Sequence, residues 1–306
     1  MKTFGIIGVS EGNGHPFSYG SIINGYSEAG LAASGWPGIH DYVRRRHASE
    51  FGIDGWSISH AWTQDPATTA RLCAACRIAH AAGDYREFLG AVDAVIIARD
   101  DHENHFAMAR PFLEAGLPVF VDKPLSLDPA ELRAFRPYLE SGRLMSCSGM
   151  RYARELDEPR ADLAPWGRLK LIRGAIVLSW EKYGVHLLEA ILAVTPAHPV
   201  SVRMLPAAHV SAAVSLDDGV LVQIDALGES PRAFRVELFG SQRLSTVEIT
   251  DNFSMFRRML WQFAESIRTG RPAIPAARTL EIMRVLIAGR MARAENREVS
   301  LDEIQL

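Results

Sequence analysis

Apolar runs and helical patterns alternate over the first 125 residues of the chain. Residues 92–98 read as a buried parallel strand, because apolar side chains occupy both of its faces. A helical pattern over residues 105–116 ends at a glycine, and residues 119–121 form the next strand. Earlier strands are predicted at residues 4–9 and 56–62, and helices at residues 39–51, 66–82 and 84–89. Repeated β-α-β units predict a Rossmann-like parallel sheet with right-handed crossovers.

The pattern changes in the second half of the chain. After a helix at residues 128–140 and a strand at 144–149, short alternating runs separated by turns predict a mostly antiparallel sheet. These strands are expected at residues 169–179, 201–205, 210–216, 220–227, 235–240 and 244–249, and helices at 186–194, 253–268 and 278–295. We therefore predict an α/β protein with a dinucleotide-binding domain over residues 1–125. An α+β domain with an open sheet follows over residues 126–306, and its last helix has the amphipathic character to pack back on the first domain.

Composition narrows the class of protein. The chain has 306 residues, 48% of them hydrophobic and 23% charged, with a net charge of −3. This balance gives no electrostatic reason to expect nucleic acid or a membrane surface as partner. No apolar run is long enough to span a bilayer and no secretory signal precedes the first strand, so a cytoplasmic location is expected. Three cysteines make no disulfide framework, and Cys73 and Cys76 are expected to pack in a helix.

Asp122-Lys123-Pro124 follows the strand at residues 119–121, at the sheet edge where open α/β proteins bind ligands. Only four of the 33 lysines and arginines are lysines, namely Lys2, Lys123, Lys170 and Lys182. Arginine cannot release a proton in a protein, whereas a buried lysine can. The placement of Lys123 therefore favours proton chemistry over a chance surface position.

A glycine loop after the first strand predicts a pyrophosphate site at the start of a helix. The fingerprint begins at Gly8, but its second and last glycine positions hold Ser10 and Asn13, with Gly12 nearby. The acid expected after the second strand is replaced by Thr63, which leaves the preference between NAD and NADP open.

These motifs resemble the Gfo/Idh/MocA family, the glucose–fructose oxidoreductase and inositol dehydrogenase group. Asp122-Lys123-Pro124 matches the family's Glu-Lys-Pro, and His105 stands where the family often opens its crossover helix with a histidine. The resemblance implies hydride transfer with NAD or NADP on a sugar or cyclitol hydroxyl, Lys123 near the nicotinamide, and a homodimer or homotetramer. The residues it implies at the cofactor are Gly8, Ser10, Gly12, Asn13, Thr63, Arg99, Asp100, His105, Asp122 and Lys123.

A second family motif, Asp-x-Gly-x-His-x-x-Asp, reads here from Lys182 to Glu189. Its histidine is His186, which suits the role of base for a substrate hydroxyl. Lys182 replaces the first acid; if it approaches Lys123, two neighbouring cations favour one neutral amine that relays the proton with His186. The alternative is that Lys182 binds an anionic substrate group, and Tyr183 is a substitute proton donor.

A further departure lies before His105, where Arg99-Asp100-Asp101 replaces the family's Thr-Pro-Asn turn. Asp100, Asp101 and His102 are adjacent in sequence and point in different directions, so no metal site is expected. Lys123, Lys182, Tyr183 and His186 form the predicted substrate set. Two rival functions stay open: an NAD-assisted lyase or glycosidase that oxidises its substrate transiently, and a non-enzymatic binding protein with a degenerate nucleotide loop.

Overall fold

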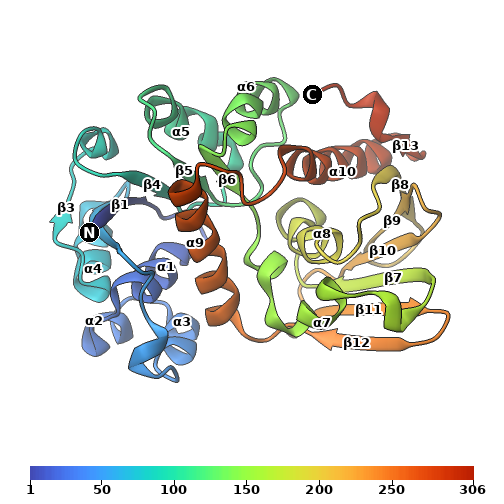
Figure 1. Cartoon of the computed structure of the whole chain (residues 1–306), viewed down its shortest axis with the longest axis horizontal. Helices are drawn as coiled ribbons and strands as arrows, with labels where there is room; N and C mark the ends of the chain where they lie inside the picture. Colours follow the sequence, from blue (N-terminus) through green and yellow to red (C-terminus); the bar gives the residue numbers. More distant parts are fainter. The chain divides into compact units, whose positions relative to one another are not determined.

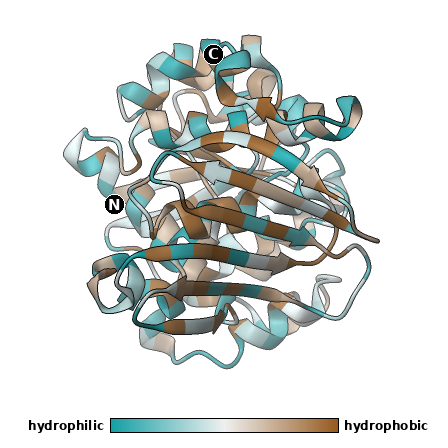
Figure 2. Cartoon of the chain, turned by 90° about the vertical axis from the view of Figure 1, so that its right-hand side faces the viewer, coloured by the Kyte–Doolittle hydropathy of each residue, from teal (hydrophilic) through white to brown (hydrophobic).

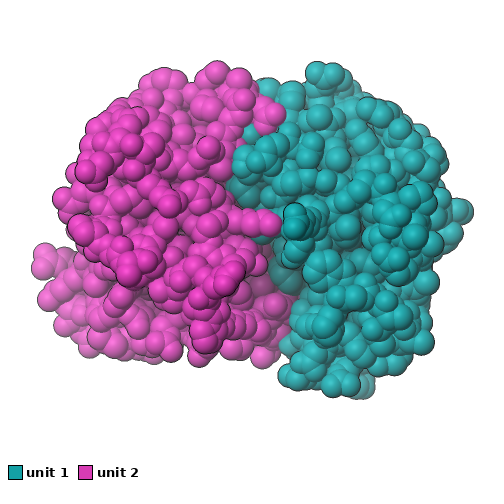
Figure 3. Space-filling view, turned by 180° about the vertical axis from the view of Figure 1, so that it is seen from behind, with its two compact units in different colours: residues 1–126, 134–146, 256–275 teal, residues 127–133, 147–255, 276–306 magenta.

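The computed structural model describes residues 1–306, which form two compact units (Figure 3). Unit 1 comprises residues 1–126, 134–146 and 256–275, and unit 2 comprises residues 127–133, 147–255 and 276–306. The strands are β1 Lys2–Ile7, β2 Trp56–Trp62, β3 His80–Ala81, β4 Ala94–Ile97, β5 Val119–Val121, β6 Leu144–Ser146, β7 Leu169–Ile176, β8 Pro199–Leu205, β9 Val210–Leu216, β10 Leu221–Ala226, β11 Phe234–Gly240, β12 Leu244–Glu248 and β13 Val299–Ser300. The α-helices are α1 His15–Asn24, α2 Glu28–Ala32, α3 Pro37–Val43, α4 Pro66–Cys76, α5 His105–Glu114, α6 Pro129–Glu140, α7 Asp157–Ala161, α8 Val185–Leu192, α9 Asn252–Thr269 and α10 Ala276–Glu295.

Unit 1 is built on a six-stranded parallel sheet in the order β3-β2-β1-β4-β5-β6. Helices α1 and α4 pack on one face and α5 on the other (Figure 1). All four residues of β4 are buried, as both covered faces require. The strand order reverses between β1 and β4, and the carboxyl edge beside this switch point is where such sheets bind ligands. The predicted Rossmann-like sheet is confirmed.

Close packing at the start of α1 depends on Gly8. A Cβ atom added to Gly8 would lie 2.0 Å from Cγ of Pro16, so a side chain here would push the helix away from the strand. Gly12 adopts a positive φ of 72°, a conformation that glycine reaches without steric cost. The glycine loop is therefore shaped by Gly8 and Gly12, although the residues between and after them depart from the usual fingerprint.

Unit 2 contains a seven-stranded sheet in the order β12-β11-β7-β10-β9-β8-β13. Every neighbouring pair is antiparallel except β7 with β10. Helices α8 and α10 pack against the strands, and Figure 2 views the opposite face, where the strands lie in front of the helices. The predicted open, mostly antiparallel sheet is confirmed.

Two helices are shorter than their patterns predicted. The helix expected at residues 39–51 ends at Val43, and a separate 3₁₀ turn covers Ala48–Glu50. The helix expected to continue to residue 82 ends at Cys76, because Arg77 adopts the left-handed conformation with φ of 53°. Its predicted start is correct, since the Asp65 carboxylate caps the backbone N–H groups of Ala67 and Thr68.

The unit boundaries differ from a division at residue 125. Strand β6 pairs with β5 and so lies in unit 1. Residues 256–275 also pack in unit 1, where the Phe263 ring lies 5.8 Å from the rings of Phe4 and Phe120. Helix α10, which was considered as a helix packing back on the first domain, belongs to unit 2. None of the helices combines the length and the apolar character needed to cross a bilayer.

Candidate active site

The structure places Asp122-Lys123-Pro124 directly after β5, as the sequence predicted. The backbone N–H of Asp122 donates to the carbonyl of Ile97 at the end of β4, which fixes this turn to the neighbouring strand. Lys123 is 3% exposed, and its Nζ lies 3.6 Å from Oδ2 of Asp100. The lysine is thus a buried cation with a carboxylate partner from the turn after β4.

Asp122 is 1% exposed and accepts three hydrogen bonds. Oδ1 accepts from the backbone N–H of Lys123 at 2.8 Å, and Oδ2 accepts from Nδ2 of Asn13 at 3.2 Å and from Nδ1 of His15. Burial by itself would raise the pKa of Asp122, but His15 and Lys123 more than offset it and hold this pKa well below its usual range. Asp122 is therefore a carboxylate anchored to the glycine loop.

Ser10 joins the glycine loop to Asp100. Its hydroxyl donates to Oδ1 of Asp100 at 2.6 Å and accepts the backbone N–H of Asp100 at 3.0 Å. Asn13 holds the start of α1, because its Oδ1 accepts the backbone N–H of His15 at 2.7 Å. Both residues that replace fingerprint glycines thus hydrogen-bond to an acid at the carboxyl edge of the sheet.

The residues of this edge fit a dinucleotide. A helix begins directly after the loop at His15, and its positive end favours an anion such as a pyrophosphate. Gly12 leaves open space, with no heavy atom within 4 Å of an added Cβ. Of the two buried acids of the site, Asp100 lies 3.6 Å from Nζ of Lys123, and Asp122 is hydrogen-bonded to His15 and is stabilised by the charge of Lys123. Their charges therefore do not stand unopposed beside the loop. Gly8, Ser10, Gly12 and Asn13 would hold the pyrophosphate, and the nicotinamide end would lie toward Lys123.

Three other residues predicted at the cofactor have mainly internal partners. Thr63 is buried, and its hydroxyl donates to the Asp65 carbonyl at 2.7 Å, so it supports the start of α4. His105 is fully buried, and its two ring nitrogens lie 2.9 Å from the Arg99 carbonyl and 3.1 Å from the Leu125 carbonyl. His105 therefore connects the turns after β4 and β5, and its place at the cofactor stays a prediction.

Arg99, the third of these residues, has one contact with a residue just after β2. Its Nε donates to Oδ1 of Asp101 at 2.8 Å and its Nη1 donates to Oε1 of Gln64 at 3.0 Å. Gln64 is exposed and follows Thr63, the position at which an acid was expected. The adenosine end of a dinucleotide would therefore meet an amide and a paired guanidinium. No group of three or more His, Cys, Asp or Glu side chains converges to hold a metal ion.

Unit 2 carries the second predicted group at the start of α8. His186 is 8% exposed, its Nδ1 lies 2.6 Å from the Ser148 hydroxyl, and its ring lies 5.0 Å from that of Tyr183 in an edge-on arrangement. Lys182 and Tyr183 lie in a π-helical turn, Trp180–Gly184, that leads directly into α8. The helix thus extends back to Lys182, although with π rather than α geometry, a form often found at functional sites.

The last acid of the second motif has a structural partner. Glu189 is 1% exposed and accepts a hydrogen bond from Nε of Arg151, which is itself buried. Burial raises the pKa of Glu189, and Arg151 opposes that rise. Ser148 and Arg151 both lie in the Ser148–Tyr152 segment, so this segment holds His186 and Glu189 through two contacts one helical turn apart.

Sequence reasoning missed Ser148 and Arg151 and committed no role to His15. Ser148 and Arg151 are each 38 residues from their partners in α8, a matched separation that signals a contact only once the two helical segments are known to pack. His15 follows the glycine loop directly, and its place before Pro16 at a helix start was the available signal.

The parallel sheet, its glycine loop and the buried lysine define a dinucleotide-binding oxidoreductase fold. Residues 38–143 match the GFO_IDH_MocA family, described as an oxidoreductase family with an NAD-binding Rossmann fold. This match confirms, over residues 38–143, the resemblance seen in the sequence. Among curated proteins, none matches the sequence.

Solved structures share the fold over nearly the whole chain. Scyllo-inositol dehydrogenase from Lactobacillus casei, with bound NAD(H) and scyllo-inositol, has a TM-score of 0.76 and 15% identity, covering 99% of both chains. Myo-inositol 2-dehydrogenase from Lactobacillus plantarum has a TM-score of 0.76 and 16% identity, covering 98% of this chain and 99% of that one. An oxidoreductase from Agrobacterium radiobacter, in complex with NAD⁺, L-tartaric acid and magnesium, has a TM-score of 0.74 and 13% identity, covering 99% of both chains.

Proposed function

We propose that the protein is an NAD(P)-dependent oxidoreductase that transfers hydride to or from a hydroxyl or carbonyl carbon of a sugar, sugar derivative or cyclitol. The observation that carries the proposal is Lys123, a buried cation at the carboxyl end of β5, tied through Asp100 to the glycine loop of a Rossmann sheet. A bound NAD(P)⁺ would supply the acceptor for the hydride of the alcohol carbon, and residues of the protein would take the hydroxyl proton.

Lys123 has the role of holding the substrate oxygen. An ammonium group in a water-poor site stabilises negative charge that develops on this oxygen as the hydroxyl loses its proton. In the reverse direction the same group polarises a carbonyl. The residue is suited to this role because it is buried and held in place, which avoids reorganisation during the reaction.

His186 has the role of exchanging the hydroxyl proton. Its Nδ1 is held by Ser148, so we assign the exchange to Nε2. Lys182 and Tyr183 are proposed as substrate-binding residues from the π-helical turn, and Lys182 gives this turn a cation where the family motif has an acid. Because the charge at this position changes from negative to positive, we propose that it binds an anionic or strongly polar group of the substrate.

The substrate class that we propose is that of polyhydroxylated molecules. The solved structures named above carry scyllo-inositol and L-tartaric acid, and both molecules present secondary hydroxyls on neighbouring carbons. We therefore propose a polyhydroxylated substrate, with sugar acids tested beside neutral cyclitols because of Lys182. A homodimer or homotetramer and a cytoplasmic location are further proposals, the first supported by the open face of the unit 2 sheet.

The deciding experiment has two stages. Fluorescence titration with NADH and NADPH establishes whether and which dinucleotide binds, and absorbance of the reduced cofactor is then followed with aldoses, sugar acids and inositols. We expect tight binding of at least one cofactor and turnover with a polyol. Released sugar without net accumulation of reduced cofactor would identify a lyase or glycosidase instead. Absence of binding by isothermal titration with both cofactors would leave a non-enzymatic binding protein.

A further inference from the structure

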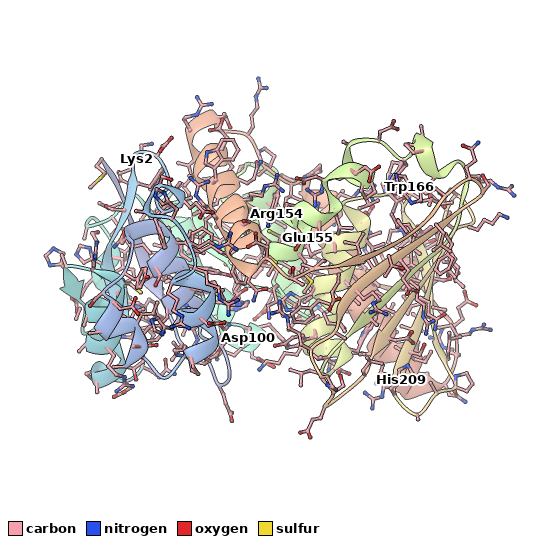
Figure 4. The ribbon with its side chains drawn as sticks, turned by 90° about the horizontal axis from the view of Figure 1, so that it is seen from below. Lys2, Asp100, Arg154, Glu155, Trp166 and His209 are labelled. Carbon is pink, nitrogen blue, oxygen red and sulfur yellow. The ribbon has the colours of Figure 1, made fainter.

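We propose that Asp100 is a positioning residue for Lys123, which it holds in place for the reacting oxygen. The inference rests on the proposed function for its catalytic consequence, whereas the pairing itself is testable without turnover. Asp100 follows β4 at the carboxyl edge of the parallel sheet (labelled in Figure 4), and Lys123 follows the adjacent strand β5. The two neighbouring strands thus place a carboxylate and an ammonium group at the same edge of the sheet.

Asp100 and Lys123 form an ion pair whose charged atoms lie beyond hydrogen-bond distance. Oδ2 of Asp100 and Nζ of Lys123 are 3.6 Å apart, which is longer than a hydrogen bond. Both groups are at least nine-tenths buried, so water screens their attraction weakly. At this separation the carboxylate stabilises the ammonium and sets its direction without forming a close hydrogen bond to it.

Asp100 is itself fixed in place. Oδ1 accepts the Ser10 hydroxyl at 2.6 Å, and the backbone N–H of Asp100 donates to the same Ser10 oxygen at 3.0 Å. Ser10 therefore closes a ring of two hydrogen bonds with Asp100 and leaves Oδ2 directed to Lys123. A carboxylate bound in this way keeps a single orientation, which a chance contact between surface side chains does not.

Two departures from the family pattern combine in this arrangement. Ser10 replaces a fingerprint glycine, and Asp100 belongs to the turn that replaces Thr-Pro-Asn. A glycine at position 10 would have no hydroxyl to hold Asp100, and a threonine, proline or asparagine in the turn would bring no negative charge to Lys123. The chain thus has an acid against its lysine where the family turn has none. We infer that these two changes form one adapted arrangement rather than separate losses.

The test of the pair uses the scarcity of lysine. With only four lysines, protein carrying ¹⁵N at Lys Nζ gives few signals, and replacement of each lysine in turn assigns them. The pH midpoint of the Lys123 signal is then followed in the wild type and in Asp100→Asn, with Asp41→Asn as control. Asp41 pairs with Arg45 on the surface of α3 and has no contact with the site. We expect Asp100→Asn to lower the Lys123 midpoint, because the variant removes the opposite charge 3.6 Å from Nζ, and the control to leave it unchanged.

The catalytic consequence is measured separately. Asp100→Asn is expected to lower kcat roughly tenfold or more and to move the alkaline limb of the kcat/KM profile to lower pH, with the dissociation constant for the reduced cofactor changed less than about threefold. Asp100→Glu should restore part of kcat. An unchanged Lys123 midpoint, or equal loss of cofactor affinity and turnover, overturns the proposal. A shifted midpoint in a protein with no activity on any polyol would instead remove the proposed function and leave the pairing intact.

Discussion

His15 and Asp122 are directly hydrogen-bonded, although 107 residues separate them in the sequence. His15 opens α1 after the glycine loop, and Asp122 precedes Lys123 after β5. The imidazole also stacks on Tyr19, with ring centroids 5.1 Å apart, and meets the edge of Phe256 at 5.2 Å. The pair therefore ties the loop that fits a pyrophosphate to the strand end that carries the reactive lysine.

This pair predicts a specific acid sensitivity. The pKa of Asp122 is depressed in the folded protein, so the carboxylate contributes stability above its ordinary pKa of about 4 and loses that contribution as the pH falls below it. At pH 7 we expect Asp122→Asn to reduce the free energy of unfolding by about 1.5–3 kcal/mol, the range for hydrogen bonds to a charged group. Urea unfolding between pH 3 and 7 should show the gap between wild type and variant narrowing below pH 4. A gap that stays constant with pH would contradict the assignment, and exposed Asp54→Asn is the control.

Lys123→Met should abolish turnover and leave dinucleotide affinity within about threefold of the wild type, because the lost ammonium acts on the substrate oxygen. Lys123→Arg should not restore activity, since a guanidinium neither fits the same contact nor releases a proton. Stopped-flow absorbance of the reduced cofactor and fluorescence titration measure the two quantities. Lys170→Met, on an exposed position of β7, is the matched control. Turnover retained in Lys123→Met would remove the lysine from the mechanism.

Much of the fold could be predicted from the sequence, because the patterns that indicate strands and helices are local. Strand β2 and strand β5 have the predicted bounds. Strand β5 is a short apolar run, whereas β2 mixes polar residues with apolar ones, and turn or cap residues follow both. The position of Lys123 at the carboxyl edge follows from the β-α-β order alone. Asp100 was expected at the cofactor from the family resemblance, and the sequence did not show that it faces Lys123, because side-chain direction depends on the turn geometry.

Other features depend on tertiary contacts that no local pattern contains. The Thr63 hydroxyl donates to the Asp65 carbonyl at the start of α4, a contact that its place after β2 does not indicate. Two carbonyls lie against the ring nitrogens of His105, and its place at the start of the crossover helix does not indicate them either. The packing of α9 in unit 1 follows from the position of Phe263 between aromatic rings. The amphipathic pattern predicted the helix but did not show which part of the protein it packs against.

The buried pair Arg151–Glu189 predicts a large difference between two arginine substitutions. Removal of Arg151 leaves Glu189 as an uncompensated buried carboxylate, so Arg151→Met should lower the free energy of unfolding by about 3–5 kcal/mol. Arg45→Met removes an ion pair whose side chains are 69% and 44% exposed, and should cost less than about 1 kcal/mol. Chemical denaturation of both variants at pH 7 measures the contrast. Equal costs would show that Glu189 is not held by Arg151, and Arg151→Met/Glu189→Gln should recover part of the stability.

We predict that replacing Ser148 lowers the turnover rate rather than the binding of the substrate. Its hydroxyl lies 2.6 Å from Nδ1 of His186, so Ser148→Ala leaves the imidazole without the contact that fixes its ring. The same hydroxyl accepts the backbone N–H of Met150, and that loss should lower stability by about 1 kcal/mol. We expect kcat to fall on the order of tenfold with KM nearly unchanged, and Ser148→Thr, which keeps a hydroxyl, to recover most of it. Steady-state kinetics on the polyol substrate, with exposed Ser230→Ala as control, decide the matter. If Ser148→Ala keeps the wild-type kcat while losing only stability, Ser148 serves the helix start alone and the proton exchange at His186 does not depend on it.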